Sequence, residues 1–456
     1  MLLSQRSART SAVRKGSTVS TPRGQMVLTM FMLSSGFQMD SWRDPRSRSE
    51  EIGELSLIAD MATAAERAKL HAVFFGDGVD VGTIRDNNIR NTGLYEPISS
   101  MGALIGATEK IGLVGSVSTT FSEPYNVARQ LTGLDRLSGG RVGWNIVTSL
   151  FGGYQNFGQS EMPSPEARYR RAQEFVDVAL KLWDSWSDDA VLNDRVSGQW
   201  ADISKIRDID YEGEHFSVKG ALNMPRSPQG HPVLFQAGQS PAGLQLGASV
   251  ADAIYTAQPD LESMRVFSDR VRAQAVTSGR DPGSIKILPG VVPIVGRTAR
   301  EAEELSQELE AFIDLVAGRR RLSFAAGISI DDLDLEESIP AERFVEGPQN
   351  SSRWHSFRRM ALEEGLTVRQ MIVAFARAGG HRILIGSAED VARDMIDWFD
   401  RGVCDGFNLD PPSIPDGMNR MLELLVPLLQ EQGYFQTDYT GDTLRERMGF
   451  ARPAGR

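Results

Sequence analysis

The sequence predicts an α/β protein, namely a (β/α)8 (TIM) barrel with insertions. Eight short apolar segments, typical of buried strands, alternate with longer segments of helical periodicity, and this alternation predicts an all-parallel sheet. No Gly-x-Gly-x-x-Gly motif follows the first expected strand, which weakens the alternative of an open, doubly wound, dinucleotide-binding sheet. The chain has 456 residues, a length that barrels with insertions reach. A closed barrel is therefore favoured.

Each expected strand is a short apolar run, and several of these runs are rich in β-branched or aromatic residues. In chain order they cover residues 26–33, 72–75, 110–118, 141–147, 232–237, 253–256, 285–295 and 405–409. Between them, apolar residues recur every three to four positions, which is the spacing of a helix with one buried face. The helical segments cover residues 51–69, 98–108, 127–137, 165–186, 240–250, 260–278, 299–316, 386–399 and 418–430.

Two polar segments interrupt the alternation and are expected to be insertions in the barrel. Residues 188–230 form the first, with a hairpin expected near residues 215–218. Residues 318–380 form the second, which is charged and contains one clear helical pattern at residues 367–378. On composition alone, the second insertion is equally well a solvated excursion on the surface.

The remaining boundaries follow from the two ends of the chain. Residues 26–448 are expected to form a single barrel domain, and residues 449–456 a short C-terminal tail. Residues 1–25 contain no acidic residue, are rich in Ser, Thr and Arg, and lack the apolar core of a secretory signal. Their composition resembles an organellar transit peptide, but a disordered basic arm or an over-long start is favoured.

Charge and composition exclude several classes of partner. The chain has 49 basic and 60 acidic residues, so its net charge of −11 does not attract nucleic acid. No apolar run approaches the roughly 18–20 residues of a membrane span, so no membrane contact is expected. The single cysteine, Cys404, excludes an intrachain disulfide, and the five histidines show no paired ligand spacing, so no metal is expected. These features predict a cytoplasmic protein.

The segment from His231 to Ser249 has the pattern of an anion-binding corner. Its apolar run ends in a turn that contains Gly238. Ser240 then stands where a helix N-cap belongs and Pro241 where a first helical residue belongs. The unpaired amides of a helix start carry a partial positive charge, so this corner is suited to a phosphate. An ordinary strand-to-helix corner, capped by a serine, is an equally good interpretation of these residues alone.

Polar residues stand at the carboxyl ends of this strand and of several other expected strands. They are Asp77, Ser116, Asn145, Gln239, Ser240, Asn408 and Asp410. Ligands of TIM barrels bind at this end of the strands, so these residues are candidates for a site. Each of them, taken singly, is more often a helix cap or a turn former.

Several longer motifs resemble a known family. They are Ser138–Ser149 (SGGRVGWNIVTS), Arg168-Tyr169, Pro225–Gly230 (PRSPQG), Gln236–Ser240 (QAGQS) and the tail segment 439–445 (YTGDTLR). They resemble the bacterial-luciferase-like flavin-dependent monooxygenases, in the branch of the nitrilotriacetate, dibenzothiophene-sulfone and pristinamycin monooxygenase A components. The resemblance extends over residues 26–448, nearly all of the chain after the arm.

This resemblance implies a (β/α)8 barrel that holds FMN. It implies a reaction of reduced FMN (FMNH2) with O2, in which a flavin C4a-(hydro)peroxide transfers one oxygen atom to a small organic substrate. A separate NAD(P)H:flavin reductase is the implied partner that supplies FMNH2, and a homodimer or larger assembly is the implied state. Two alternatives stay open: an oxidoreductase of the same superfamily that uses a deazaflavin, and a flavin-binding barrel without catalysis.

The resemblance also implies cofactor contacts at matching positions. Asp77 corresponds to a residue that contacts the isoalloxazine ring, and Ser116 and Asn145 correspond to further flavin contacts. Tyr169 and Ser240 correspond to residues at the phosphate, and Gln239 adjoins them. No catalytic residue is assigned.

Three arginines flank Tyr169 at the start of a helix, namely Arg168, Arg170 and Arg171. Cations at this end oppose the helix dipole, so an anion is expected to offset them. The alternative is that they pair with carboxylates of Glu161, Glu166 or Glu174.

Two departures from the family pattern concern histidines. Pro165 stands where relatives carry a flavin-contacting histidine, and proline cannot donate that hydrogen bond. Residues 36–41 lack the histidines that some relatives have there. His355 and His381 are then the histidines expected near a substrate, whereas Cys404 is expected in the core.

Overall fold

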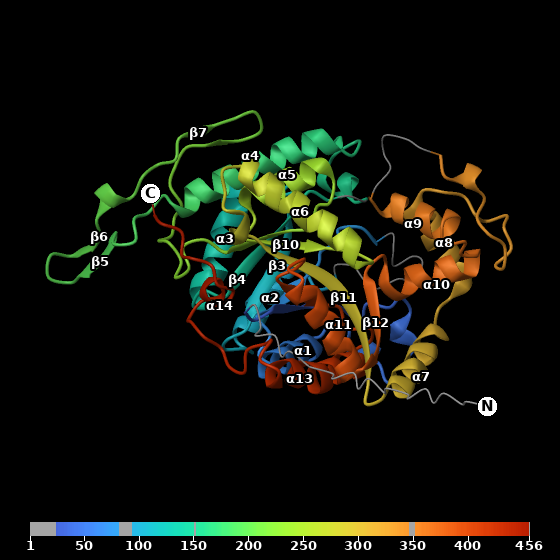
Figure 1. Ribbon diagram of the computed structural model, residues 1–456. Coiled ribbons are helices and arrows are strands. Elements are labelled where there is room, and N and C mark those ends of the chain that lie inside the picture. Colours follow the sequence, from blue (N-terminus) through green and yellow to red (C-terminus); the bar gives the residue numbers. More distant parts are fainter. Residues whose placement is uncertain (1–23, 82–93, 150–151, 346–351, 456) are drawn as a thin grey trace, which may run out of the picture.

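The computed structural model describes residues 24–81, 94–149, 152–345 and 352–455. Its centre is a closed barrel of parallel strands with helices around it (Figure 1). The barrel strands are β1 (Val27–Met32), β2 (Ala72–Phe75), β3 (Gly112–Ser118), β4 (Val142–Val147), β9 (Val233–Gln236), β10 (Ala253–Thr256), β11 (Lys286–Gly296) and β13 (Gly406–Leu409). They pair in this order, and β13 pairs with β1 to close the ring. The predicted fold class is confirmed, and every expected strand is present.

One strand, β12 (Arg382–Ser387), was not expected. It pairs with the second half of β11, from Val291 to Gly296, whereas the first half of β11 pairs with β10. This strand lies outside the closed ring and is only partly buried, with Ile385 exposed. It therefore lacks the continuous apolar run of a strand that is covered on both faces. The prediction of a helix from residue 386 was correct only from Ala388 onward.

The helices pack their apolar faces on the outside of the barrel. They are α1 (Leu55–Arg67), α2 (Pro97–Ile105), α3 (Pro124–Leu137), α4 (Pro165–Trp183), α5 (Pro241–Val250), α6 (Leu261–Thr277), α7 (Ala299–Glu310), α11 (Ala388–Asp400), α12 (Asp416–Arg420), α13 (Val426–Glu431) and α14 (Leu444–Arg447). The single helix expected at residues 299–316 is wrong. It ends at Glu310, and α8 (Leu315–Ala326) begins after Asp314, whose carboxylate accepts hydrogen bonds from two amides of the new helix.

The first insertion forms two small hairpins. One joins β7 (Tyr211–Glu212) to β8 (Ser217–Val218), which confirms the hairpin expected near residues 215–218. The other joins β5 (Val191–Asp194) to β6 (Gln199–Ala201) and was not expected, because its strands are mostly exposed. Figure 1 shows the hairpin of β5 and β6 projecting away from the barrel.

The second insertion folds into a helical unit beside the barrel, visible in Figure 1 as the group of α8, α9 (Ser352–Leu362) and α10 (Val368–Ala378). Only α10 was expected from the sequence. These helices bury an apolar cluster of their own, which includes Leu322, Phe357 and Ile372. A solvated surface excursion is therefore the wrong description of this segment.

The two ends of the chain differ in what the structure describes. Residues 1–23, nearly all of the expected basic arm, lie outside the described residues. The C-terminal tail is held against the first insertion, because Arg452 forms an ion pair with Asp188 at 2.6 Å and Pro453 accepts a hydrogen bond from Arg226. Cys404 is buried, as expected. Within the described residues, no helix has the length and apolar character needed to cross a membrane.

Candidate active site

The corner between β9 and α5 has the predicted geometry. Ser240 is the N-cap of α5, Pro241 is its first residue, and the Ser240 hydroxyl accepts a hydrogen bond from the Gly243 amide at 3.1 Å. The cap is exposed, so an anion can reach it from solvent. The corner therefore combines a free helix start with a hydroxyl at the carboxyl end of a barrel strand.

Tyr169 comes to the same corner from α4. Its hydroxyl accepts a hydrogen bond from the Ser240 hydroxyl at 3.5 Å, the limit for such a bond, so the contact does not use the Tyr169 hydrogen and an anion can compete for the Ser240 hydrogen. A Cβ on Gly238 would meet the Tyr169 hydroxyl at 2.9 Å, and one on Gly243 would meet it at 2.8 Å. Both glycines are thus needed for this close approach. The structure brings together the two residues expected at the phosphate.

Asn145 and Ser116 form a second polar point on the neighbouring strands β4 and β3. They are directly paired in the sheet, both side chains are buried, and the Asn145 amide nitrogen donates to the Ser116 hydroxyl at 2.7 Å. The side-chain oxygen of Asn145, Oδ1, is buried and has no hydrogen-bond partner among the described residues. A buried unpaired acceptor costs free energy, so this atom is suited to an N–H group of a ligand.

Two predicted site residues lie less directly at the site. Asp77 follows β2 and is exposed, and among the described residues no hydrogen bond or ion pair joins it to the other predicted residues. Local desolvation and the charge of Glu96 raise the pKa of Asp77. The Gln239 side chain donates to the Ala257 carbonyl at 3.4 Å, which ties the turn after β9 to the turn after β10.

The arginines beside Tyr169 are mostly occupied by protein groups. Arg171 donates to two backbone carbonyls and lies 3.6 Å from Glu123. Arg170 is exposed and faces Glu214 at 3.8 Å. Arg168 is buried and donates to the Ser149 carbonyl at 2.7 Å. Among the described residues, no ion pair joins these arginines to Glu161, Glu166 or Glu174, although the nearby charges of Arg170 and Arg168 favour the ionised form of Glu166. Of these three arginines, Arg168 alone has a buried donor, its Nε, without a partner among the described residues.

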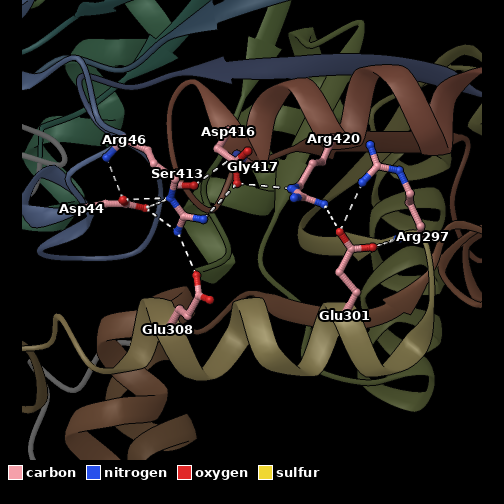
Figure 2. A network of polar contacts seen from close by, with 9 residues as sticks. All are labelled: Asp44, Arg46, Arg297, Glu301, Glu308, Ser413, Asp416, Gly417 and Arg420. Carbon is pink, nitrogen blue, oxygen red and sulfur yellow. Dashed lines mark hydrogen bonds and ion pairs between the residues drawn. The ribbon is translucent and has the colours of Figure 1, made fainter.

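The segment from Ser34 to Asp44, which lacks the family histidines, is joined to α7 through Asp44 and Arg46. Arg46 contacts Asp44 at 2.9 Å and Glu308 of α7 at 3.2 Å, and Arg420 of α12 pairs with Glu301 of α7 at 2.8 Å (Figure 2). Pro165 is the first residue of α4, as expected. His355 of α9 is exposed and packs edge-on against Trp354, away from the residues above.

His381 lies in a polar cluster that sequence reasoning did not find as a unit. Its Nδ1 lies 3.3 Å from the Tyr255 hydroxyl and 3.6 Å from a carboxylate oxygen of Asp410. Tyr255 belongs to β10, and Asp410 directly follows β13. A second missed residue is Gln236, a buried amide at the end of β9 beneath Gly238, whose carbonyl oxygen has no partner among the described residues. The signal for both was a polar or aromatic residue at the end of an apolar strand.

Together, the closed parallel barrel, the capped helix start and the buried side-chain amide of Asn145 place a polar corner suited to an anion at the carboxyl ends of the strands, where barrel enzymes bind their ligands. Comparison with known proteins identifies the family. A family model of luciferase-like monooxygenases matches residues 34–405, and the chain belongs to this family. The family consists of flavin-dependent oxygenases, so the resemblance and the prediction of an enzyme are confirmed.

Individual relatives cover almost the full chain. The chain is 37% identical over 440 residues to N-acetyl-S-(2-succino)cysteine monooxygenase of Bacillus subtilis (strain 168), covering 96% of this chain and 99% of that protein. It is 36% identical over 441 residues to nitrilotriacetate monooxygenase component A of Aminobacter aminovorans, covering 94% and 97%. A crystal structure of riboflavin lyase with modified FMN and riboflavin superposes with a TM-score of 0.84 at 30% identity, covering 95% and 97%.

Proposed function

We propose that this protein is the oxygenase component of a two-component monooxygenase, which uses FMNH2 and O2 to oxidise a small organic substrate. The observation that carries the proposal is the meeting of Tyr169 and Ser240, 71 positions apart, over a pair of glycines at a helix start. This corner is suited to the FMN phosphate. The buried side-chain oxygen of Asn145, which has no partner among the described residues, is suited to an N–H group of the flavin ring.

Named residues would then hold the cofactor in two places. Tyr169, Ser240 and the first amides of α5 would bind the phosphate, and Ser116 with Asn145 would orient the ring, while Asp77 and Gln239 border the site. Bound FMNH2 would supply two electrons, so that one atom of O2 enters the substrate and the other leaves as water. The C4a-(hydro)peroxide route stays a prediction.

The relatives support the remaining parts of the proposal. The name of nitrilotriacetate monooxygenase component A implies a second component, and we infer that a separate NAD(P)H:flavin reductase supplies FMNH2 here as well. A homodimer or larger assembly and a cytoplasmic location stay predictions. A buried thiol at Cys404 agrees with a reducing compartment.

An anaerobic titration of the purified protein with FMN, FMNH2 and a deazaflavin tests this function. We expect the tightest binding for FMNH2. A preference for the deazaflavin would establish the alternative oxidoreductase, and flavin binding without O2-dependent product would establish the non-catalytic barrel. Oxygen-consumption screening with an unrelated flavin reductase, across amine, sulfone and alkane compounds, then identifies the substrate class.

A further inference from the structure

The polar cluster of Tyr255, His381 and Asp410 lies across the barrel from the proposed flavin-ring contacts. Around the eight-stranded ring, β11 is four strands from β3, and β13 is four strands from β4. The cluster surrounds Gly290 of β11 and adjoins β13, whereas Ser116 and Asn145 belong to β3 and β4. A ligand between the two groups would therefore face the cluster.

Gly290 makes the room in which the three side chains meet. A Cβ at this position would lie 2.5 Å from His381 Nδ1, 2.6 Å from the Tyr255 hydroxyl and 2.8 Å from Asp410 Oδ2. Glycine inside a central strand weakens the strand, since it has no side chain to pack and loses the most backbone freedom. Here it marks the close approach of polar groups.

A chain of hydrogen bonds fixes Asp410 from below. The Thr29 hydroxyl donates to the side-chain oxygen Oδ1 of Asn408 at 2.6 Å. The side-chain nitrogen Nδ2 of Asn408 in turn donates to Asp410 Oδ1 at 3.0 Å. The Asp410 side chain is fully buried, so its other oxygen, Oδ2, is held toward Tyr255 at 3.4 Å and His381 at 3.6 Å. A buried carboxylate is costly unless a cation or donors face it, and a protonated His381 can supply a positive charge at this carboxylate.

Tyr255 and His381, unlike Asp410, are partly exposed. Their rings stack with centroids 5.5 Å apart. Tyr255 also contacts Phe31 and Phe74 from the opposite part of the barrel wall, at 6.4 Å and 6.0 Å, so its ring lies within the barrel. The next residue, Arg382, is bound to Asp394 and does not neutralise the cluster. Tyr255 and Asp410 are titratable groups in direct contact with His381.

We propose that Tyr255 and His381 hold the exchangeable proton that the oxygenation requires, and that Asp410 positions them. The proposal rests on the proposed function. The overall conversion of substrate, O2 and FMNH2 into oxygenated substrate, water and FMN balances without net proton uptake. The pair lends a proton to the oxygen atom that leaves as water, and it regains one from the two that FMNH2 loses.

One test measures the reoxidation of protein-bound FMNH2 by O2 between pH 6 and 9, in wild-type protein, His381→Asn and Tyr255→Phe. We expect His381→Asn to slow the reaction by about 10²-fold and to remove its pH dependence, with the FMNH2 dissociation constant unchanged. Tyr255→Phe slows it as well. The matched control is His215→Asn, in the first insertion beside Glu214, which keeps the wild-type rate. Wild-type rates and pH profiles in both Tyr255→Phe and His381→Asn overturn the proposal.

A second readout uses the ligand-free protein and does not depend on flavin binding. In NMR titrations of the imidazole groups, Asp410→Asn lowers the titration midpoint of His381 by about one pH unit or more, because a facing carboxylate favours the imidazolium. Tyr255→Phe shifts the same midpoint, and His355 titrates unchanged. An unchanged His381 midpoint in both variants overturns the coupling of the three groups. Failure of wild-type protein to bind FMNH2 overturns only the proposed function, since this titration still decides the coupling.

Discussion

Replacing Ser240 with alanine separates two roles of one hydroxyl. Its hydrogen bond from the Gly243 amide, at 3.1 Å, caps α5, and losing an N-cap costs about 1 kcal/mol of folding stability. If the hydroxyl also donates to the FMN phosphate, the variant loses a charge-assisted hydrogen bond of about 1–2 kcal/mol, roughly a 5- to 30-fold increase in dissociation constant. The assay is an anaerobic titration with chemically reduced FMN.

Ser387→Ala is the matched control, because Ser387 caps α11 in the same way and accepts a hydrogen bond from the Asp390 amide at 3.3 Å. Both variants lose stability in urea unfolding, but only Ser240→Ala binds FMNH2 more weakly. Equal dissociation constants for Ser240→Ala and wild-type protein would refute the phosphate assignment, and a loss of affinity in Ser387→Ala would show that destabilisation alone explains the effect.

Three further predictions test other parts of the structure. Asn145→Leu removes the buried carbonyl oxygen and weakens FMNH2 binding by about 10-fold, seen in the same titration, and an unchanged affinity would remove Asn145 from the ring site. Arg226→Met removes one partner of the buried Asp184, which Arg226 contacts at 2.9 Å, whereas His231 still contacts the same carboxylate at 2.7 Å, and the substitution lowers the free energy of unfolding by about 1.5–3 kcal/mol. The exposed pair of Arg300 and Glu304 is the control, since Arg300→Met leaves the free energy of unfolding nearly unchanged. Burial raises the pKa of Asp135 to about 6, so the folded state binds this proton more tightly than the unfolded state and stability falls as pH rises from about 4 to about 6. Asp135→Asn removes this fall, which urea unfolding at pH 4.5 and 7 measures, and equal pH dependence in both proteins would contradict the assignment.

The barrel was predictable because its strands are buried on both faces and read as continuous apolar runs. The corner at Ser240 was predictable for another reason, since N-cap chemistry depends only on neighbouring residues. Where burial is partial the pattern fails, as in β12 with its exposed Ile385 and in the exposed hairpin of β5 and β6. The helices α8 and α9 were missed because they bury their apolar residues against each other and α10, not against the barrel.

The site was only partly predictable. Tyr169 and Ser240 meet as expected, and so do Ser116 and Asn145. The cluster at His381 joins residues that are far apart in the sequence. Tyr255 lies 126 positions before His381 and 155 positions before Asp410, so no local pattern reveals their contacts. The arginines beside Tyr169 were assigned to an anion from charge alone, whereas Arg171 is satisfied by the carbonyl groups of Thr119 and Ser122.

The central claim is that the helix start at Ser240, together with Tyr169, binds the phosphate of a flavin whose ring reaches Asn145. A crystal structure of the protein soaked with excess FMN measures this directly. The account predicts phosphate oxygens within hydrogen-bond distance of both hydroxyls and a ring N–H on the Asn145 carbonyl oxygen. An FMN bound elsewhere, or a corner at Ser240 filled by side chains of the protein, would contradict it.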